Sequence, residues 1–458
     1  MKNIFITVSL IFSLNLFGQD CDCLKNITFL QEKVEKNQAS YQHQVIESNR
    51  KDVYDIYKNK MNTLSKEIDN KRDCIGLISI YLDFFRDEHS FIYYDEHFSA
   101  QDHFQKKIKS RKNSLNEFEG LWYFEDGSFS IKITPSVNGF SKWLAIIQKG
   151  YKPFWKKGQV KIEFFQDENQ NLKCIYWRQN LIPKVYDVTV SDSVLSIGRY
   201  LNFYRNKTDN TENSSFQTNN LVFKELTVNT NYLKLPSFDL SQTHKIDSLI
   251  TLNKHFINSK RNLIIDVINN GGGGFDAFKS ILPYILDSEI VEQPYYGSVW
   301  VSKDNLEYYD RTKYEYAETE KDSIDELKYV QFLKEHKGIF TPIEMEKDTI
   351  SLSSGFLEKI GVIFNRNTAS SAEGFILTSS YSEKVKTFGE NTMGAVSYGD
   401  WMPIEIPELN IWIVITTKKM IFQQNEDFES IGISPNVDLS SYKEEDWINI
   451  VLNNLEEK

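Results

Sequence analysis

Two apolar runs far apart in the chain each end in a polar turn that leads into a helix-like segment. Residues 263–268 are followed by Asn-Asn and four glycines, and residues 361–364 are followed by the sequence Asn-Arg-Asn-Thr-Ala-Ser-Ser. Short runs of β-branched residues bounded by such turns are typical of buried strands. The two patterns predict two strand–turn–helix units, and residues 221–458 continue to alternate strand-like and helix-like segments. That alternation indicates an α/β domain.

The two turns carry the parts that acyl transfer needs. The glycine turn is almost bare backbone, and the second turn presents Ser370 at the start of a helix, where free N–H groups favour an oxyanion. We expect the N–H groups of Ser371 and Gly272 to form an oxyanion hole, and Asn270 and Gly273 to contact the substrate. Two alternatives remain: Ser370 could serve only as a helix N-cap, or Ser371 could be the nucleophile.

Four motifs in a fixed order carry a family resemblance. They are the Ile-Asp-Val-Ile-Asn-Asn-Gly-Gly-Gly strand and loop at 265–273, Thr-Ala-Ser-Ser-Ala-Glu at 368–373, Gly-Glu-Asn-Thr-Met-Gly at 389–394 and Glu-Ser-Ile-Gly-Ile-Ser-Pro-Asn at 429–436. The sequence thereby resembles the C-terminal processing (tail-specific) peptidases of family S41 and their tricorn-like relatives. Ile268 stands where those relatives usually have arginine. The resemblance implies a crotonase/ClpP-like catalytic domain over residues 221–458, no cofactor and no metal.

The resemblance also bears on the catalytic base. Many relatives use a lysine directly after the Thr-x-Gly motif, but Ala395 occupies that position. Tricorn-like relatives use a histidine from the N-terminal region and a glutamate near the C-terminus. The segment Asp-Glu-His-Ser at 87–90 resembles their histidine turn, and Glu429 occupies their glutamate position. The expected triad is Ser370, His89 and Glu429, with His97 as the alternative base.

Composition and periodicity divide the rest of the chain into further segments, so the sequence predicts a multidomain α+β protein. Residues 19–117 are charged and poor in Gly and Pro, with apolar residues at helical spacing, which predicts a helical N-terminal domain. Residues 118–205 contain short aromatic and β-branched runs about ten residues apart, which predicts an antiparallel sandwich or barrel. Residues 206–220 are polar and predict a linker.

The N-terminus and the cysteines predict an exported protein. Residues 1–18 have a lysine followed by an apolar stretch of signal-peptide length, so we expect a cleaved signal and a periplasmic or extracellular location. Cys21, Cys23, Cys74 and Cys174 allow three pairings, of which we expect Cys23–Cys74; buried free thiols are the alternative. The net charge of −11 gives no reason to expect a nucleic-acid partner.

The sequence therefore predicts an exported serine peptidase that acts on peptide or protein substrates without an integral membrane span. Two alternatives belong to other classes. One is an inactive relative that binds an extended peptide or apolar ligand. The other is a cell-envelope module whose residues 118–205 bind a glycan or lipid.

Overall fold

The computed structural model describes residues 21–94, 118–136, 140–150, 155–198, 201–206, 220–291, 295–315, 319–343, 348–353, 355–422 and 427–457. The expected signal sequence 1–18, the alternative base His97 and nearly all of the expected linker 206–220 lie outside the described residues. Along the described part of the chain, no helix combines the length and the apolar character needed to cross a bilayer.

The N-terminal unit is helical, as the sequence predicted. Side-chain caps fix two of its helix starts: Asp22 accepts the Lys25 N–H (3.1 Å) and Asn70 accepts the Asp73 N–H (2.9 Å). The described helices end at Asp83, before the expected boundary at residue 117. The elements are α1 (Cys23–Asn37), α2 (Ala39–Tyr41), the π-helix η1 (Gln42–Glu47), α3 (Lys51–Ser65) and α4 (Lys71–Asp83).

A disulfide between Cys23 and Cys74 joins the start of α1 to α4, which confirms the pairing expected from the sequence. The two Cα atoms are 5.4 Å apart, within the usual range for a disulfide. Cys174 is a buried free thiol in the β-rich module.

The disulfide should contribute measurably to stability. It closes a loop with a sequence separation of 51 residues, so the chain-entropy relation gives about 3–4 kcal/mol of stabilisation. We expect the Cys23→Ser/Cys74→Ser variant to lose about that much free energy of unfolding in urea titrations, compared with the oxidised wild type. Alkylation and intact-mass analysis without reductant should leave Cys23 and Cys74 unmodified. Modification of both without reductant would contradict the assignment.

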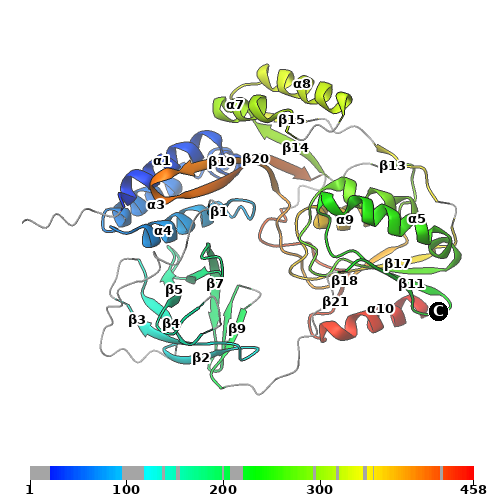
Figure 1. The fold of residues 1–458 in the computed structure, drawn as a ribbon, viewed down its shortest axis with the longest axis horizontal. Coiled ribbons are helices and arrows are strands. Elements are labelled where there is room, and N and C mark those ends of the chain that lie inside the picture. Colours follow the sequence, from blue (N-terminus) through cyan, green and yellow to red (C-terminus); the bar gives the residue numbers. More distant parts are fainter. Residues whose placement is uncertain are drawn as a thin grey trace, which may run out of the picture.

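The middle module is a closed barrel of consecutive antiparallel strands in which the first strand pairs with the last (Figure 1). Fully buried side chains such as Trp122, Phe164 and Phe203 fill its core, as expected for a small barrel. The strands are β2 (Gly120–Phe124), β3 (Ser130–Pro135), β4 (Trp143–Lys149), β5 (Val160–Gln166), β6 (Leu172–Trp177), β7 (Pro183–Val190), β8 (Val194–Ile197) and β9 (Leu201–Tyr204).

A mostly parallel six-stranded sheet forms the C-terminal α/β domain, in the order β10-β11-β12-β17-β18-β21. Helices α5 (Thr243–Ser259), α9 (Ser371–Ser379) and α10 (Trp447–Glu456) accompany it. One of its apolar cores contains residues from β12, β17, α5 and α9. The strands are β10 (Val222–Glu225), β11 (Thr230–Lys234), β12 (Asn262–Asp266), β17 (Lys359–Phe364), β18 (Val385–Gly389) and β21 (Val437–Asp438).

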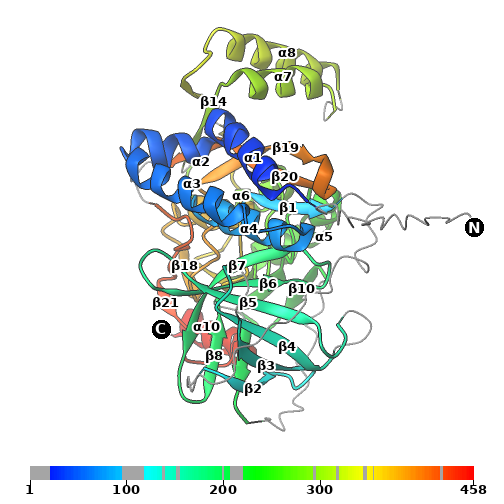
Figure 2. The same ribbon diagram turned by 90° about the vertical axis from the view of Figure 1, so that its left-hand side faces the viewer.

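A second sheet ties the N-terminal unit to the C-terminal half. The short strand β1 (Phe91–Tyr94) follows the helical unit and pairs antiparallel with β20 (Ile411–Phe422). The other strands of that sheet are β14 (Tyr295–Trp300), β15 (Phe340–Pro342) and β19 (Tyr398–Ile406). One apolar core contains side chains of the helices, of the barrel and of β19 and β20. The view in Figure 2 shows the barrel beneath the helices, and the pair α7 (Lys303–Thr312) and α8 (Glu320–Lys334) at the far end.

Candidate active site

The two turns singled out in the sequence lie next to each other because β12 and β17 are neighbouring parallel strands. The turns are also bonded directly. The Thr368 hydroxyl donates to the Val267 carbonyl (2.9 Å), and the Ala369 N–H donates to the Asn270 carbonyl (2.9 Å). These bonds hold the glycine loop against the start of α9.

Gly272 lies closest to Ser370. Its φ is +92°, and a Cβ there would lie 2.7 Å from the Ala369 carbonyl oxygen and 2.8 Å from the Ser370 Cβ. Such a conformation and approach require glycine. The Gly272 N–H donates to the Asn270 side-chain oxygen at 2.9 Å, so it is already committed and does not match the oxyanion role expected from the sequence.

The buried side chain of Asn270 holds the glycine loop in place by hydrogen bonds to backbone groups. It is fully buried, and its side-chain amide donates to the Leu235 carbonyl at 2.9 Å. This arrangement differs from the expected substrate contact.

Gly273 lies between two residues of the glycine loop that are bonded to Phe238. The Phe238 N–H donates to the Gly272 carbonyl, and the Gly274 N–H donates to the Phe238 carbonyl. Among the described residues, none accepts the N–H of Gly273.

Ser370 occupies a strained position at the start of α9. Its φ is +57°, which is uncommon for a residue other than glycine. Its own N–H donates to the carboxylate of Glu373 at 2.9 Å, which helps to hold the turn. Within the described residues, the N–H of Ser371 has no acceptor. Ser370 is thus followed directly by a backbone donor, the N–H of Ser371, for which no described residue is an acceptor.

Glu373 is a buried carboxylate that connects the serine turn to the Thr-x-Gly motif. Besides the Ser370 N–H, it accepts the Thr392 hydroxyl (2.6 Å) and the N–H groups of Gly394 and Ala395 (2.9 Å each). Burial raises its pKa, and these donors oppose that shift. Ala395, which stands in the lysine position of many relatives, therefore contributes through its backbone.

His89 reaches the serine from the opposite end of the chain. Its Nε2 lies 3.2 Å from the Ser370 Oγ, which is hydrogen-bonding distance, and its ring is partly buried. The Nδ1 atom is buried, and no hydrogen-bond partner for it lies among the described residues. The structure thus brings together the serine and histidine that the sequence analysis paired.

Asp87 holds the turn that carries His89. One of its carboxylate oxygens accepts the N–H of His89 at 3.1 Å. The other accepts four side-chain donors, from Gln38 (3.3 Å), Ser40 (2.9 Å), Ser90 (2.9 Å) and Thr416 (2.6 Å). The histidine turn is therefore fixed both to the helical unit and to β20.

Glu429 lies beside this pair and bonds to backbone rather than to the imidazole. Its two oxygens accept the N–H groups of Glu88 and Ser397, each at 2.9 Å. Carboxylate oxygens of Asp87 and Glu429 and a ring nitrogen of His89 all lie within 4.8 Å of one another. Glu429 thus fixes the residue before His89 and places a carboxyl group near the His89 ring.

The electrostatics favour a neutral histidine. Burial lowers the pKa of His89 below its usual value; Asp87 and Glu88 oppose that shift, and Lys184 adds to it. Burial, reinforced by Asp87, raises the pKa of Glu429 well above the ordinary glutamate range. Neutral imidazole is the form that can accept a proton from serine.

The lysines in β20 are engaged elsewhere. Lys418 forms an ion pair with Asp400 at 2.8 Å, and Lys419 pairs with Glu47 at 3.4 Å. Neither lysine is therefore available as a base for Ser370.

Two residues of the site, Asp87 and Glu373, lie within the sequence motifs, but the sequence analysis assigned no role to either. The signal for Asp87 was its position two residues before His89, the spacing at which an aspartate accepts a local backbone N–H.

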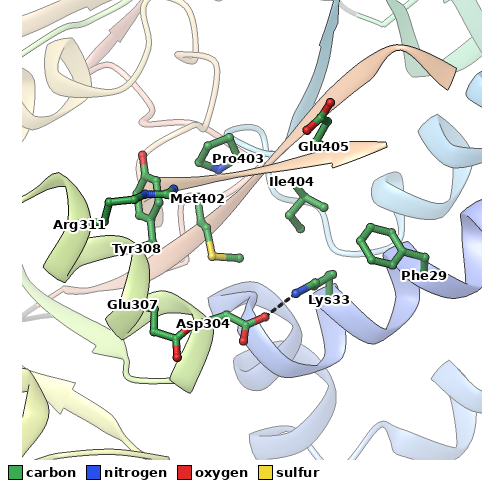
Figure 3. A pocket seen from close by; sticks show the side chains of 10 residues that line it. All are labelled: Phe29, Lys33, Asp304, Glu307, Tyr308, Arg311, Met402, Pro403, Ile404 and Glu405. Carbon is green, nitrogen blue, oxygen red and sulfur yellow. Dashed lines mark hydrogen bonds and ion pairs between the residues drawn. The ribbon is translucent and has the colours of Figure 1, made fainter. Parts of the chain in front are cut away.

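A separate pocket of about 400 Å³ lies between α1, α7 and β19 (Figure 3). Its lining includes Phe29, Tyr308 and Met402, and a Lys33–Asp304 ion pair of 2.6 Å crosses its edge. None of its lining residues belongs to the serine turn, the glycine loop or the histidine turn. The pocket is therefore distinct from the Ser370 site.

Comparisons with known proteins bear on the family and the fold. Residues 229–439 match the model of peptidase family S41. Mature CPAF in complex with lactacystin aligns at 12% identity with a TM-score of 0.52, covering 91% of this chain and 93% of that chain. Another structure of mature CPAF aligns at 13% identity with a TM-score of 0.50, covering 91% and 92%. At these identities the likeness concerns the fold. No curated protein matches the sequence.

Proposed function

With its residues 229–439 the chain belongs to peptidase family S41, and we propose that it is an exported serine peptidase that cleaves peptide bonds through an acyl-enzyme at Ser370. The observation that carries the proposal is the 3.2 Å contact between the Ser370 Oγ and the His89 Nε2, next to the Ser371 N–H, for which no described residue is an acceptor. A nucleophile, a base and an oxyanion site within reach of one another are the requirements of acyl transfer.

The proposed reaction proceeds in two halves. As the Ser370 Oγ attacks the substrate carbonyl carbon, its proton passes to the Nε2 of His89. The N–H groups of Ser371 and Gly273 stabilise the oxyanion, with Gly273 replacing Gly272 as the second donor. His89 then gives the proton to the leaving amine. In the second half, water loses a proton to His89 and attacks the acyl-enzyme, which releases the acid and restores Ser370.

In this mechanism Glu429 acts on the histidine without a direct hydrogen bond. Its bond to the Glu88 N–H fixes the peptide that precedes the histidine, and its carboxyl group lies beside the imidazole. Two observations support export: the apolar N-terminal stretch of the sequence and the Cys23–Cys74 disulfide, which suits an oxidising compartment.

A serine-directed fluorophosphonate probe tests the nucleophile. We expect the purified protein to be labelled at Ser370 and the Ser370→Ala variant to lose all labelling. Ser371→Ala is the matched control: it keeps the backbone N–H and should retain most of the labelling. The probe should also block cleavage of a mixed peptide library.

Two outcomes would overturn the proposal. Labelling that survives in Ser370→Ala and disappears in Ser371→Ala would assign the nucleophile to the neighbouring serine. A wild-type protein that neither reacts with the probe nor cleaves peptides would favour the inactive binding protein considered from the sequence.

A further inference from the structure

The barrel contacts the helical unit through three neighbouring strands, each of which supplies an ion pair. Glu163 on β5 pairs with Arg72 (2.7 Å), and Lys173 on β6 pairs with Asp83 (2.7 Å). Lys184 on β7 pairs with Glu88. Figure 2 shows these strands beneath the helices. The first two pairs hold α4 and its end, whereas the third reaches the histidine turn.

The Lys184–Glu88 pair lies one residue from His89. Its side chains are partly buried, with exposed fractions of 30% for Lys184 and 25% for Glu88. The backbone N–H of Glu88 also donates to Glu429. Glu88 is therefore held from both sides, by the barrel through its side chain and by the catalytic domain through its backbone.

We propose that Lys184 of the barrel is a positioning residue for catalysis, which fixes the Glu88–His89 segment and balances the negative charge around the imidazole. This inference rests on the proposed function of the same site. It gives the barrel a role in the reaction, because the barrel supplies Lys184, a cation that opposes the effect of Asp87 and Glu88 on the pKa of His89.

The charges around His89 determine the direction in which each substitution should shift its pKa. Asp87 and Glu88 raise the pKa of His89, and Lys184 opposes them; the carboxyl group of Glu429 also lies beside the ring. Removal of Lys184 leaves Glu88 uncompensated, which favours the imidazolium and raises the pKa of His89. Removal of the Glu88 charge leaves Lys184 uncompensated, which lowers that pKa. The two substitutions break the same ion pair but shift the histidine in opposite directions.

The experiment is the pH dependence of kcat/KM. Because only neutral His89 accepts the serine proton, Lys184→Met should move the acidic limb to higher pH and Glu88→Gln should move it to lower pH. Near about pH 6, Lys184→Met should be roughly three- to tenfold slower than wild type, with the deficit narrowing as the pH rises. Lys184→Arg should keep most of the wild-type profile.

Two controls separate this role from a merely structural one. Lys173→Met breaks the neighbouring barrel pair and should leave the acidic limb in place. The Lys184→Met/Glu88→Gln double variant should return the limb toward its wild-type position. Shifts in the same direction for both single variants, or an equal shift in Lys173→Met, would overturn the proposal.

An NMR titration of the His89 ring in wild type and in Lys184→Met measures the same effect without turnover. A higher pKa in the variant supports the role of Lys184, and an unchanged pKa refutes it. If the wild type cleaves no peptide, the proposed function fails while this measurement still decides the inference.

Discussion

Replacing His89 with alanine is expected to lower kcat by about four to six orders of magnitude, as loss of a triad base does in other serine peptidases. The Ser370 Oγ has the His89 Nε2 at 3.2 Å. Without that acceptor the hydroxyl must attack without losing its proton, and the leaving amine receives none. Peptide cleavage followed by mass spectrometry measures the loss.

The size of the loss should be specific to the triad. Glu429→Gln should cost less than His89→Ala, because the base remains and the replacement side chain keeps one oxygen that can accept an N–H. His255→Ala, on the exposed side of α5, is the matched control and should leave kcat nearly unchanged. A His89→Ala enzyme that keeps most of its activity would remove His89 from the mechanism.

The wild-type rate should rise with pH through the pKa of His89. Burial lowers this pKa from its usual value, so the protonated, inactive form should already be the minor one near neutrality. The acidic limb of kcat/KM should therefore lie below about pH 6.5, the ordinary histidine value. A limb well above that value would mean that the carboxylates outweigh burial.

Replacing Arg72 with methionine is expected to lower the free energy of unfolding by about 3–5 kcal/mol, the range for a buried ion pair that loses one partner. Arg72 forms an ion pair with Glu163, and both side chains are buried, with exposed fractions of 3% for Arg72 and 0% for Glu163. The carboxylate of Glu163 also accepts the Ser141 hydroxyl (2.8 Å) and the Trp177 indole N–H (3.0 Å). These donors cannot replace the lost positive charge.

Urea unfolding measures this loss, and a double variant tests its cause. Arg72→Met/Glu163→Leu removes both charges and should be more stable than Arg72→Met alone, because no uncompensated carboxylate remains. The exposed pair Lys60–Glu168 provides the control: Lys60→Ala should change stability by less than about 1 kcal/mol. A loss of that small size in Arg72→Met would show that the buried pair contributes little.

The sequence predicted the serine, the histidine and the strands behind the serine because their motifs are local. It missed the committed N–H of Gly272, since that hydrogen bond depends on how the Asn270 side chain turns inside the loop. Glycine content shows that a backbone can approach a ligand, but it does not show which donor is open. Coordinates were therefore needed to show that the Gly272 N–H donates to the Asn270 side chain.

The pairing of strands that are distant in sequence was the other feature that the sequence did not predict. The alternation of residues 118–205 predicted antiparallel strands, but only the pairing of β2 with β9 distinguishes a closed barrel from a sandwich. Likewise, four residues of β1 gave no local sign that they join β20, more than 300 residues later. Strand partners that distant are set by the tertiary fold, which local periodicity does not report.

The distance along the chain between the catalytic groups has a consequence for biosynthesis. Ser370 and His89 are 281 positions apart, and the Glu88 N–H is held by Glu429, which is 341 positions further on. A ribosome must therefore synthesise the chain as far as residue 429 before these contacts can all form. A nascent or truncated chain that ends before residue 429 lacks the carboxyl group that holds the Glu88 N–H, so we expect the proposed activity to appear only after that segment has been synthesised and folded.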